Sequence, residues 1–355
     1  MSGGTIVVRF GSDLRLTDNP ALHHAVEEGD SLVALFVWAP EEEADWPPGG
    51  AHRWWLHSTL EALSADLEEA GLPLILRAGS SASVLADVVE ATGARAVFWN
   101  TRHTPAAKEA DAALKQSLEE AGTEVRTFAS YLLHDPDAIQ TGAGGPYRVF
   151  SPFWRKAKGA LEVGEPLPRP AFAELTPLDD TPPSDELESF ELTPEAQDGV
   201  DWASGLREAW TPGEEGAQGA LRDFVADRLI DYVEARDAPH VNGTSRLSPY
   251  LHHGELSPRQ VWHTVQGWVQ NGPMRKAADG FLEEIGWREF SYHVLHHYPD
   301  TLREPLNVKF ESFRWREDEE GLRRWQQGKT GFPIVDAGMR QLWHTGWMHN
   351  RVRMI

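Results

Sequence analysis

Up to about residue 130, short apolar runs alternate with segments whose apolar residues recur at helical spacing. Such runs predict strands buried on both faces, as in a parallel sheet. The helical segments begin at typical start signals, and no glycine-rich dinucleotide motif follows the first strand. The alternation predicts a doubly wound, five-stranded parallel α/β domain over residues 1–130. The predicted strands are 6–10, 32–38, 74–76, 96–99 and 125–128, and the predicted helices begin near Pro20, Arg53, Ser80 or Ser81, and Thr104.

The pattern changes twice after this region. Residues 131–219 are rich in Pro, Glu, Asp and Ser in their second half, which predicts a long interdomain connection. Residues 220–355 show helical spacing almost throughout and predict a mostly α-helical domain. The sequence ends at Ile355 within helical spacing and without a cap, so we expect a truncated copy of a longer domain. The predicted helices are 221–236, 248–254, 258–270, 279–297, 319–327 and 333–345.

Composition narrows the class of protein. The 355 residues include no cysteine, no apolar run long enough to cross a membrane and no signal-like N-terminus, so we expect a cytoplasmic protein without membrane contact. A net charge of −22 argues against nucleic-acid binding. From Arg222 onward, however, there are 18 basic and 18 acidic residues, so the whole excess lies in the first part. A local basic surface on the helical domain is therefore compatible with DNA binding.

The segment 244–255 predicts an anion site. Thr244, Ser245 and Ser248 supply three hydroxyl groups, and Arg246 supplies a guanidinium. Ser248 followed by Pro249 predicts a helix N-cap with proline in the first turn, where exposed N–H groups attract an anion. This combination is suited to a diphosphate.

A second block predicts a binding surface on one helix. Glu284, Trp287 and Arg288 are spaced i, i+3 and i+4, which places a carboxylate, an aromatic ring and a cation on one helical face. The alternative is a helix with a core tryptophan and two solvated charges. A third block combines the sequence GFPIVD at 331–336 with GWMHNRVRM at 346–354.

These three blocks, with the motifs at 13–20 and 145–154, resemble the photolyase/cryptochrome family of flavoproteins. The resemblance implies an α/β antenna domain and a helical FAD-binding domain that is incomplete here. It further implies a monomer that binds FAD and damaged DNA and that repairs cyclobutane pyrimidine dimers by light-driven electron transfer from reduced FAD. The alternatives are a cryptochrome-type blue-light photoreceptor and an inactive fragment of either protein.

The resemblance assigns roles to individual residues. It implies a lesion pocket lined by Glu284, Trp287, Asn350 and Met354. Flavin contacts are implied for Tyr232, Thr244, Ser245, Arg246, Leu247, Ser248, Phe281, Glu284 and Arg288. DNA contacts are implied for Arg236, Trp287, Asn350, Arg351 and Arg353, and Trp315 is implied as the surface end of an electron-transfer chain. For Arg236, an ion pair with Glu234 or Asp237 is the alternative.

An antenna chromophore and a metal are less well supported by the sequence. Gly11 and Ser12 replace the paired arginines of many relatives. Ala107 and Lys108 replace the Asn and Glu of some folate-binding members, so folate is doubtful and a deazaflavin, another chromophore or none stays open. The histidine pairs 252–253 and 296–297 suggest a metal, but neighbours on a helix do not face one ligand sphere, so we predict no metal.

Overall fold

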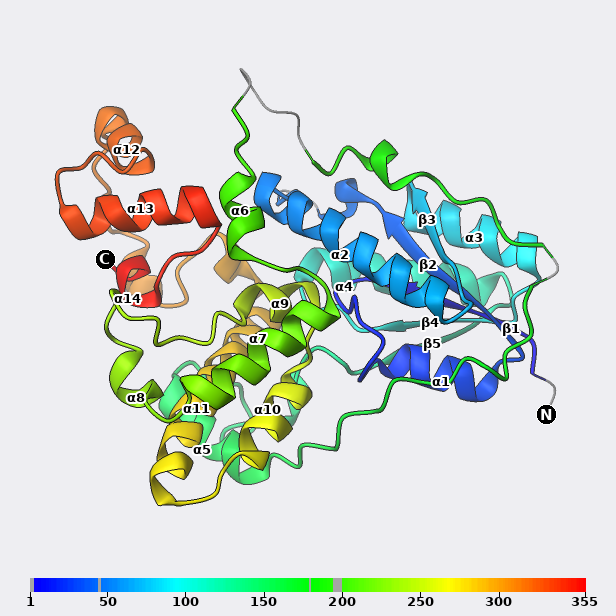
Figure 1. The fold of residues 1–355 in the computed structure, drawn as a ribbon, viewed down its shortest axis with the longest axis horizontal. Coiled ribbons are helices and arrows are strands. Elements are labelled where there is room, and N and C mark those ends of the chain that lie inside the picture. The colour runs from blue at the N-terminus through cyan, green and yellow to red at the C-terminus, as the bar shows by residue number, and fades with distance from the viewer. Residues whose placement is uncertain (1–2, 44–45, 179, 194–199) are drawn as a thin grey trace.

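The computed structural model describes residues 3–43, 46–178, 180–193 and 200–355. The α/β domain holds a five-stranded sheet in the order β3-β2-β1-β4-β5, and every neighbouring pair is parallel. This confirms the predicted doubly wound sheet, which occupies the right half of Figure 1. The strands are β1 (Thr5–Phe10), β2 (Ser31–Trp38), β3 (Leu74–Ala78), β4 (Ala96–Asn100) and β5 (Glu124–Phe128).

Successive residues of the strands feed two separate cores, because their side chains point to opposite faces of the sheet. Ile6 and Val8 of β1 pack in a cluster with Leu22 and Leu60, whereas Val7 packs in a second cluster with Leu85. Helices therefore cover both faces, which explains why the central strands have no polar side. The helices of this domain are α1 (Pro20–Glu28), α2 (Gly50–Glu69), α3 (Ser81–Thr92) and α4 (Pro105–Glu120), with a 3₁₀ turn at Pro40–Glu43.

The predicted connection contains a helix that the sequence reading missed. Helix α5 (Phe150–Ala160) buries Phe150, Phe153, Trp154 and Ala157 on one side, a spacing typical of an amphipathic helix. From Leu161 the chain runs over the outside of the α/β domain, as the green segment in Figure 1 shows. The connection also contains α6 (Ser204–Ala209) and the 3₁₀ turns Pro136–Ala138 and Leu187–Phe190.

The helical domain agrees with the predicted order, but its first helix begins at Glu214, seven residues before the predicted 221 and inside the predicted connection. The predicted helix 221–236 is two helices, because the Leu229 N–H bonds back to the Phe224 carbonyl at 2.9 Å and its buried side chain ends the first one. The predicted helix 279–297 begins seven residues earlier, where Asn271 accepts a hydrogen bond from the Met274 N–H at 3.0 Å. The helices are α7 (Glu214–Asp227), α8 (Tyr232–Ala235), α9 (Ser248–His253), α10 (Pro258–Gly267), α11 (Gly272–His297), α12 (Glu319–Gln326), α13 (Pro333–Thr345) and α14 (Asn350–Arg353), with 3₁₀ turns at Pro299–Leu302 and Val308–Phe310.

The two domains share buried polar contacts around the motif 13–20. Arg15 is 1% exposed and donates to the Gly254 carbonyl at 2.8 Å, across the domain boundary. Asp18 is fully buried and pairs with Arg259 at 2.7 Å, and it also accepts a hydrogen bond from the Ser257 hydroxyl. The family-like motif therefore fixes the helical domain against the sheet.

Glu255 is a second buried link between the domains. Its carboxylate is fully buried and accepts hydrogen bonds from Trp55 Nε1 at 3.0 Å, Thr59 Oγ1 at 2.5 Å and the Gly213 N–H at 2.5 Å. Burial raises the pKa of Glu255 to about 7, although the three donors favour the ionised form. The domain boundary therefore contains a carboxyl group that titrates near neutrality.

The last part of the chain buries fewer of its apolar side chains than the rest. Trp315 is 84% exposed and Trp343 is 78% exposed, and the buried cluster near α13 contains only Met339, Met348 and Val352 among the described residues. No helix in the described ranges is both long and apolar enough to cross a membrane.

Candidate functional site

A chain of alternating charges joins three helical elements. Arg236, just after α8, pairs through Nη2 with Glu284 Oε1 of α11 at 2.7 Å, and through Nε with Asp237 at 3.6 Å. Arg351 of α14 pairs with the same Asp237 at 2.7 Å. The structure therefore brings the predicted Glu284, Arg236 and Arg351 together. The alternative prediction for Arg236, an ion pair with Glu234 or Asp237, holds in part, because Arg236 pairs with Asp237 as well as with Glu284.

Trp287 presents one face of its ring to solvent. Its other face stacks on Phe150 of α5, with ring centroids 3.7 Å apart and planes at 14°. Phe290 contacts the edge of the indole at 6.0 Å, and Trp287 itself is 45% exposed. The indole is therefore held flat by a buried aromatic partner, and its accessible face is a platform for another ring.

Phe150 is a site residue that the sequence reading did not assign. It begins α5 and is 5% exposed. The motif 145–154 is part of the family resemblance. Nothing in its spacing, however, shows that Phe150 contacts a helix more than 130 residues later in the chain. The contact depends on tertiary packing of α5 against α11.

The short helix α14 carries the other predicted lesion-pocket residues, Asn350 and Met354, which would form the wall of the pocket opposite Trp287. Asn350 Nδ2 donates to Met354 Sδ at 3.7 Å, and Arg351 Nη1 donates to the same sulfur at 3.8 Å. Arg353 is exposed. Asn350, Arg351 and Met354 therefore form one cluster, and the Arg351–Asp237 pair connects it to Arg236.

The predicted diphosphate segment lies at the start of α9, with one boundary shifted. Ser248 is the first helical residue and Leu247 is the N-cap, so the prediction of Ser248 as the cap is wrong by one position. The Leu247 carbonyl already accepts the Leu251 N–H at 3.0 Å, which makes Leu247 the residue where the helix begins. The Leu247 side chain is 1% exposed and belongs to the domain core.

The polar groups of this segment are available to an anion. Ser245 Oγ accepts the Leu247 N–H at 3.4 Å, whereas no protein group within the described ranges hydrogen-bonds the Thr244 or Ser248 hydroxyls. Arg246 has a left-handed backbone, φ +56°, and its guanidinium lies 4.8 Å from the Trp347 ring centroid. Its Nε is buried without a hydrogen-bond partner. An acceptor such as a phosphate oxygen would satisfy that orphaned donor.

Two other predicted flavin contacts are core residues. Tyr232 is 6% exposed and Phe281 is 3% exposed, and their rings meet edge to face at 5.2 Å. Burial raises the pKa of the Tyr232 hydroxyl, so it stays protonated. Little of either ring is accessible, and their flavin contacts stay predictions.

The Arg288 side chain points away from those of Glu284 and Trp287 and contacts Tyr131 instead. Its guanidinium donates to the Tyr131 carbonyl at 2.7 Å and lies over the Tyr131 ring at 4.2 Å. The three residues share a helical face, but their long side chains diverge toward α8, α5 and the connection. The predicted flavin contact of Arg288 is not among these interactions and stays a prediction. Trp315 is a surface residue that meets only the Phe313 ring among the described aromatic contacts.

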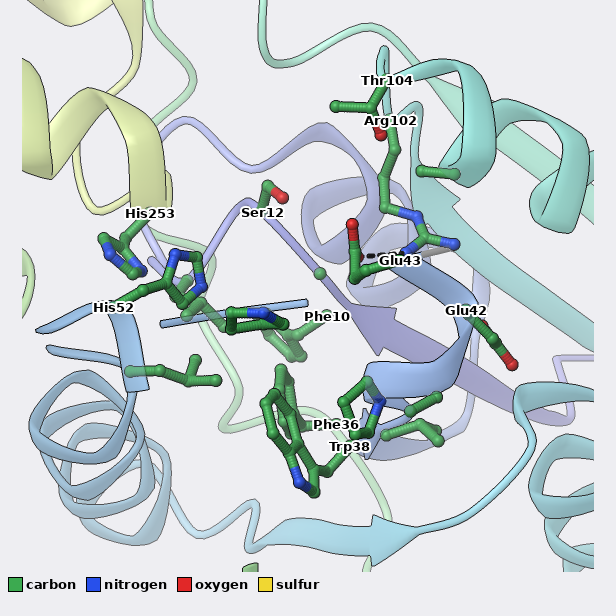
Figure 2. Close-up of a pocket in the computed structure, with 18 of the residues that line it drawn as sticks. Phe10, Ser12, Phe36, Trp38, Glu42, Glu43, His52, Arg102, Thr104 and His253 are labelled. Atoms are coloured by element: carbon green, nitrogen blue, oxygen red, sulfur yellow. Dashed lines mark ion pairs between the residues drawn. The ribbon is translucent and has the colours of Figure 1, made fainter. Parts of the chain in front are cut away.

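A separate cavity of about 330 Å³ lies at the carboxyl ends of β1 and β2, toward the helical domain. This is the edge of a doubly wound sheet where ligands bind. Figure 2 shows His52 and His253 on one side of the cavity and the Arg102–Glu43 ion pair, 3.8 Å long, across from them. Gly11, Ser12 and Ala107, three of the four positions at which the sequence departs from its relatives, line it.

Two clusters of potential metal ligands occur in the described ranges: His52, His252 and His253, and Asp137, His296 and His297. In each cluster one ligand atom per residue lies within 4.8 Å of the others. The expectation that neighbouring histidines cannot face a common ligand is therefore wrong. A third residue from another element completes each cluster, and His252 and His253 occupy the last turn of α9.

Comparison with known proteins gives a consistent result. The family described as DNA photolyase matches residues 6–171, and the FAD binding domain of DNA photolyase matches residues 281–355. A deoxyribodipyrimidine photo-lyase of Agrobacterium fabrum is 45% identical over 99% of this chain and 71% of the relative. Cryptochrome-2 of Arabidopsis thaliana is 36% identical over 98% of this chain and 58% of the relative.

Comparison with solved structures also finds a photolyase with a similar fold. The crystal structure of a bacterial class III photolyase from Agrobacterium tumefaciens superposes with a TM-score of 0.92 and 43% identity. The match covers 100% of this chain and 72% of that chain.

Proposed function

Because the chain belongs to the photolyase/cryptochrome family, we propose that it binds FAD and damaged DNA and uses light to split cyclobutane pyrimidine dimers. The observation that supports this most is the Trp287 platform, which is stacked on Phe150 at 3.7 Å and open on its other face. A flipped pyrimidine has a π face of matching size, and stacking on an aromatic contributes about 1 to 3 kcal/mol per base.

The charges around the platform complement a nucleotide. The Glu284 carboxylate lies one helical turn from Trp287 and accepts from Arg236, so it is held where it can hydrogen-bond a base edge. Arg351 and Arg353 on α14 supply cations for the phosphates beside a flipped nucleotide. Asn350 and Met354 complete the second wall.

The segment 244–248 would hold the diphosphate of FAD. The Thr244 and Ser248 hydroxyls and the orphaned Arg246 Nε are the donors that fit it. When bound, the reduced flavin supplies the electron that opens the dimer ring under light. The protein positions the lesion on Trp287, excludes water from one face of the ring and offers the Glu284 carboxylate.

The 330 Å³ cavity supports a second, antenna chromophore. Phe10, Phe36 and Trp38 provide an apolar floor, and Arg102 and His103 provide polar groups. Ala107 lines the cavity and lacks the amide that the resemblance associates with folate. A deazaflavin, another chromophore or none therefore stays open for this cavity.

A blue-light photoreceptor of the cryptochrome type is the second candidate. Its support is the 36% identity to the Arabidopsis cryptochrome over nearly the whole chain. A sensor has no need of a pocket for an extruded dimer, so the Glu284–Trp287 arrangement favours repair. Binding of intact and dimer-containing duplexes, followed by illumination, separates the two functions. Equal affinity for both duplexes and no light-dependent ring opening would favour the photoreceptor.

Stacking on Trp287 predicts a selective loss of lesion affinity. Trp287→Ala should weaken binding of dimer-containing DNA about tenfold to a hundredfold and leave intact DNA unchanged, because only a flipped base reaches the ring. Phe150→Leu keeps apolar volume but removes the supporting ring, so a loss of about two- to tenfold is expected. Trp268→Ala, at the similarly exposed Trp268 at the end of α10, is the control. If Trp268→Ala and Trp287→Ala behave alike, the platform is not the lesion site.

The Arg351–Asp237 pair predicts two opposite effects on DNA binding. Arg351→Ala should weaken damaged and intact DNA alike and reduce the salt dependence by about one unit of slope. Asp237→Asn should strengthen both, because it releases Arg351 and removes a charge that repels phosphates. Lys115→Ala on α4, in the acidic half, is the control and should change neither. A salt slope unaffected by both substitutions would place the backbone contacts elsewhere.

A further inference from the structure

Three histidine rings meet where the helical domain faces the cavity. His52 comes from the first turn of α2, and His252 and His253 come from the last turn of α9. His252 Nε2 lies 3.2 Å from His52 Nδ1, and the ring centroids of His52 and His253 are 4.5 Å apart. One nitrogen of each ring lies within 4.8 Å of those of the other two. The rings therefore converge on one point from two domains.

The spacing is close to that of a tetrahedral metal site. Zinc–nitrogen bonds of about 2.0 to 2.1 Å in a tetrahedron separate the ligand nitrogens by about 3.3 to 3.4 Å. The 3.2 Å between His52 and His252 already matches one edge of that tetrahedron. The ligand nitrogen of His253 lies within 4.8 Å of those of the other two rings, and binding would have to draw it in to complete the other two edges.

A metal is bound by an imidazole nitrogen that carries no proton. The contact of 3.2 Å between His52 Nδ1 and His252 Nε2 shows that one of these two nitrogens now holds a proton directed at the other. On ligation, that proton would move to the other nitrogen of the same ring.

The surroundings fix the rings and leave one side open. His253 stacks on Trp55 at 5.7 Å with planes at 14°, and the Tyr131 hydroxyl donates to the His252 carbonyl at 3.2 Å. Arg288 is the cation that acts on His252, and its charge is compensated by Glu289 at 3.6 Å. All three histidines line the cavity, which leaves the fourth coordination position open to it.

We propose that His52, His252 and His253 form a binding site for one divalent transition metal ion of the zinc type, with a fourth ligand supplied from the cavity. Three neutral imidazoles with an open position are the ligand set of a zinc site that exchanges its fourth ligand. The ion would link α2 to α9 and thus the α/β domain to the helical domain. This proposal does not depend on flavin or DNA binding.

The test is metal titration of the chain after treatment with a chelator. Because the second cluster also offers ligands, the starting protein carries His296→Gln and His297→Gln. We expect one Zn²⁺ per chain by calorimetry and a visible Co²⁺ spectrum of tetrahedral type. His252→Gln, at an exposed ring, should weaken Zn²⁺ binding more than about 100-fold, since even changes to groups behind a ligand cost about 10- to 100-fold.

Two further variants make the outcome decisive. His52→Gln should reproduce the loss, whereas His57→Gln, one turn along α2 and paired with Glu61, should retain full affinity. Thermal melting without metal must give the same midpoint for each variant and its parent; a variant that melts earlier is replaced by His→Asn at the same position. Absence of stoichiometric binding in the parent, or binding that survives both His252→Gln and His52→Gln, would overturn the proposal.

Discussion

Replacing Glu255 with glutamine is expected to change the pH dependence of the unfolding free energy between about pH 4.5 and pH 7. In the folded protein the pKa of Glu255 is about 7, against an ordinary value of 4.5. Between these values Glu255 binds more protons in the folded state than in the unfolded state, so its contribution to stability falls as pH rises. The full difference amounts to about 3 kcal/mol above pH 7 and vanishes below pH 4.5.

The measurement is denaturant unfolding of the wild type and Glu255→Gln at several pH values. Other buried groups, such as Asp13, titrate in both proteins and cancel in the difference. With its oxygen at the Oε1 position, the glutamine keeps an acceptor for Gly213, Thr59 and Trp55, which all bond that oxygen in the wild type. We expect the variant to gain stability relative to the wild type as pH rises, and parallel pH curves would contradict the assignment.

A leucine at the same position tests the hydrogen bonds rather than the charge. Glu255→Leu leaves the Trp55 and Gly213 donors unsatisfied, and each orphaned donor costs about 1 to 3 kcal/mol, whereas the Thr59 hydroxyl still donates to the Trp55 carbonyl at 2.9 Å. The leucine variant should therefore be the least stable of the three at every pH. Glu61→Leu on the exposed side of α2 is the control and should change stability little.

The sequence predicted the sheet well because the relevant signal is local. The central strands are apolar on both faces, and helices lie on both sides of them, so their continuous apolar runs distinguish them from their surroundings. Helix α5 was missed although Phe150, Phe153, Trp154 and Ala157 have helical spacing. The basic and small residues between them, and the proline after Ser151, made the segment similar to the connection around it.

The candidate site was predicted less completely, because its contacts are not local. Spacing placed Glu284 and Trp287 on one helical face, but it does not show that Phe150 lies behind the indole. Helical periodicity also does not show that the histidines of α9 meet His52, because that ring comes from α2, about 200 residues earlier. Arg288 shows the opposite error, since a shared face does not make long side chains converge.

Removing two hydroxyls from the segment 244–248 is expected to have the largest effect on flavin binding. Thr244→Val and Ser248→Ala preserve size closely, and in the described part of the chain neither hydroxyl bonds another protein group. The fold should therefore tolerate both changes. Each hydrogen bond to a charged phosphate is worth about 1.5 to 3 kcal/mol, so the double variant should bind FAD at least about a hundredfold more weakly.

The control and the readout separate this site from the lesion platform. Ser204→Ala in α6 removes a surface hydroxyl that bonds only the Asp201 carbonyl, and FAD affinity should not change. Trp287→Ala should also leave FAD affinity nearly unchanged, because its ring packs on Phe150 rather than near Arg246. Titration of flavin fluorescence measures the affinity in each case. The unpaired Arg246 Nε also belongs to the proposed diphosphate site. Equal FAD affinity in the double variant and the wild type would place the diphosphate elsewhere.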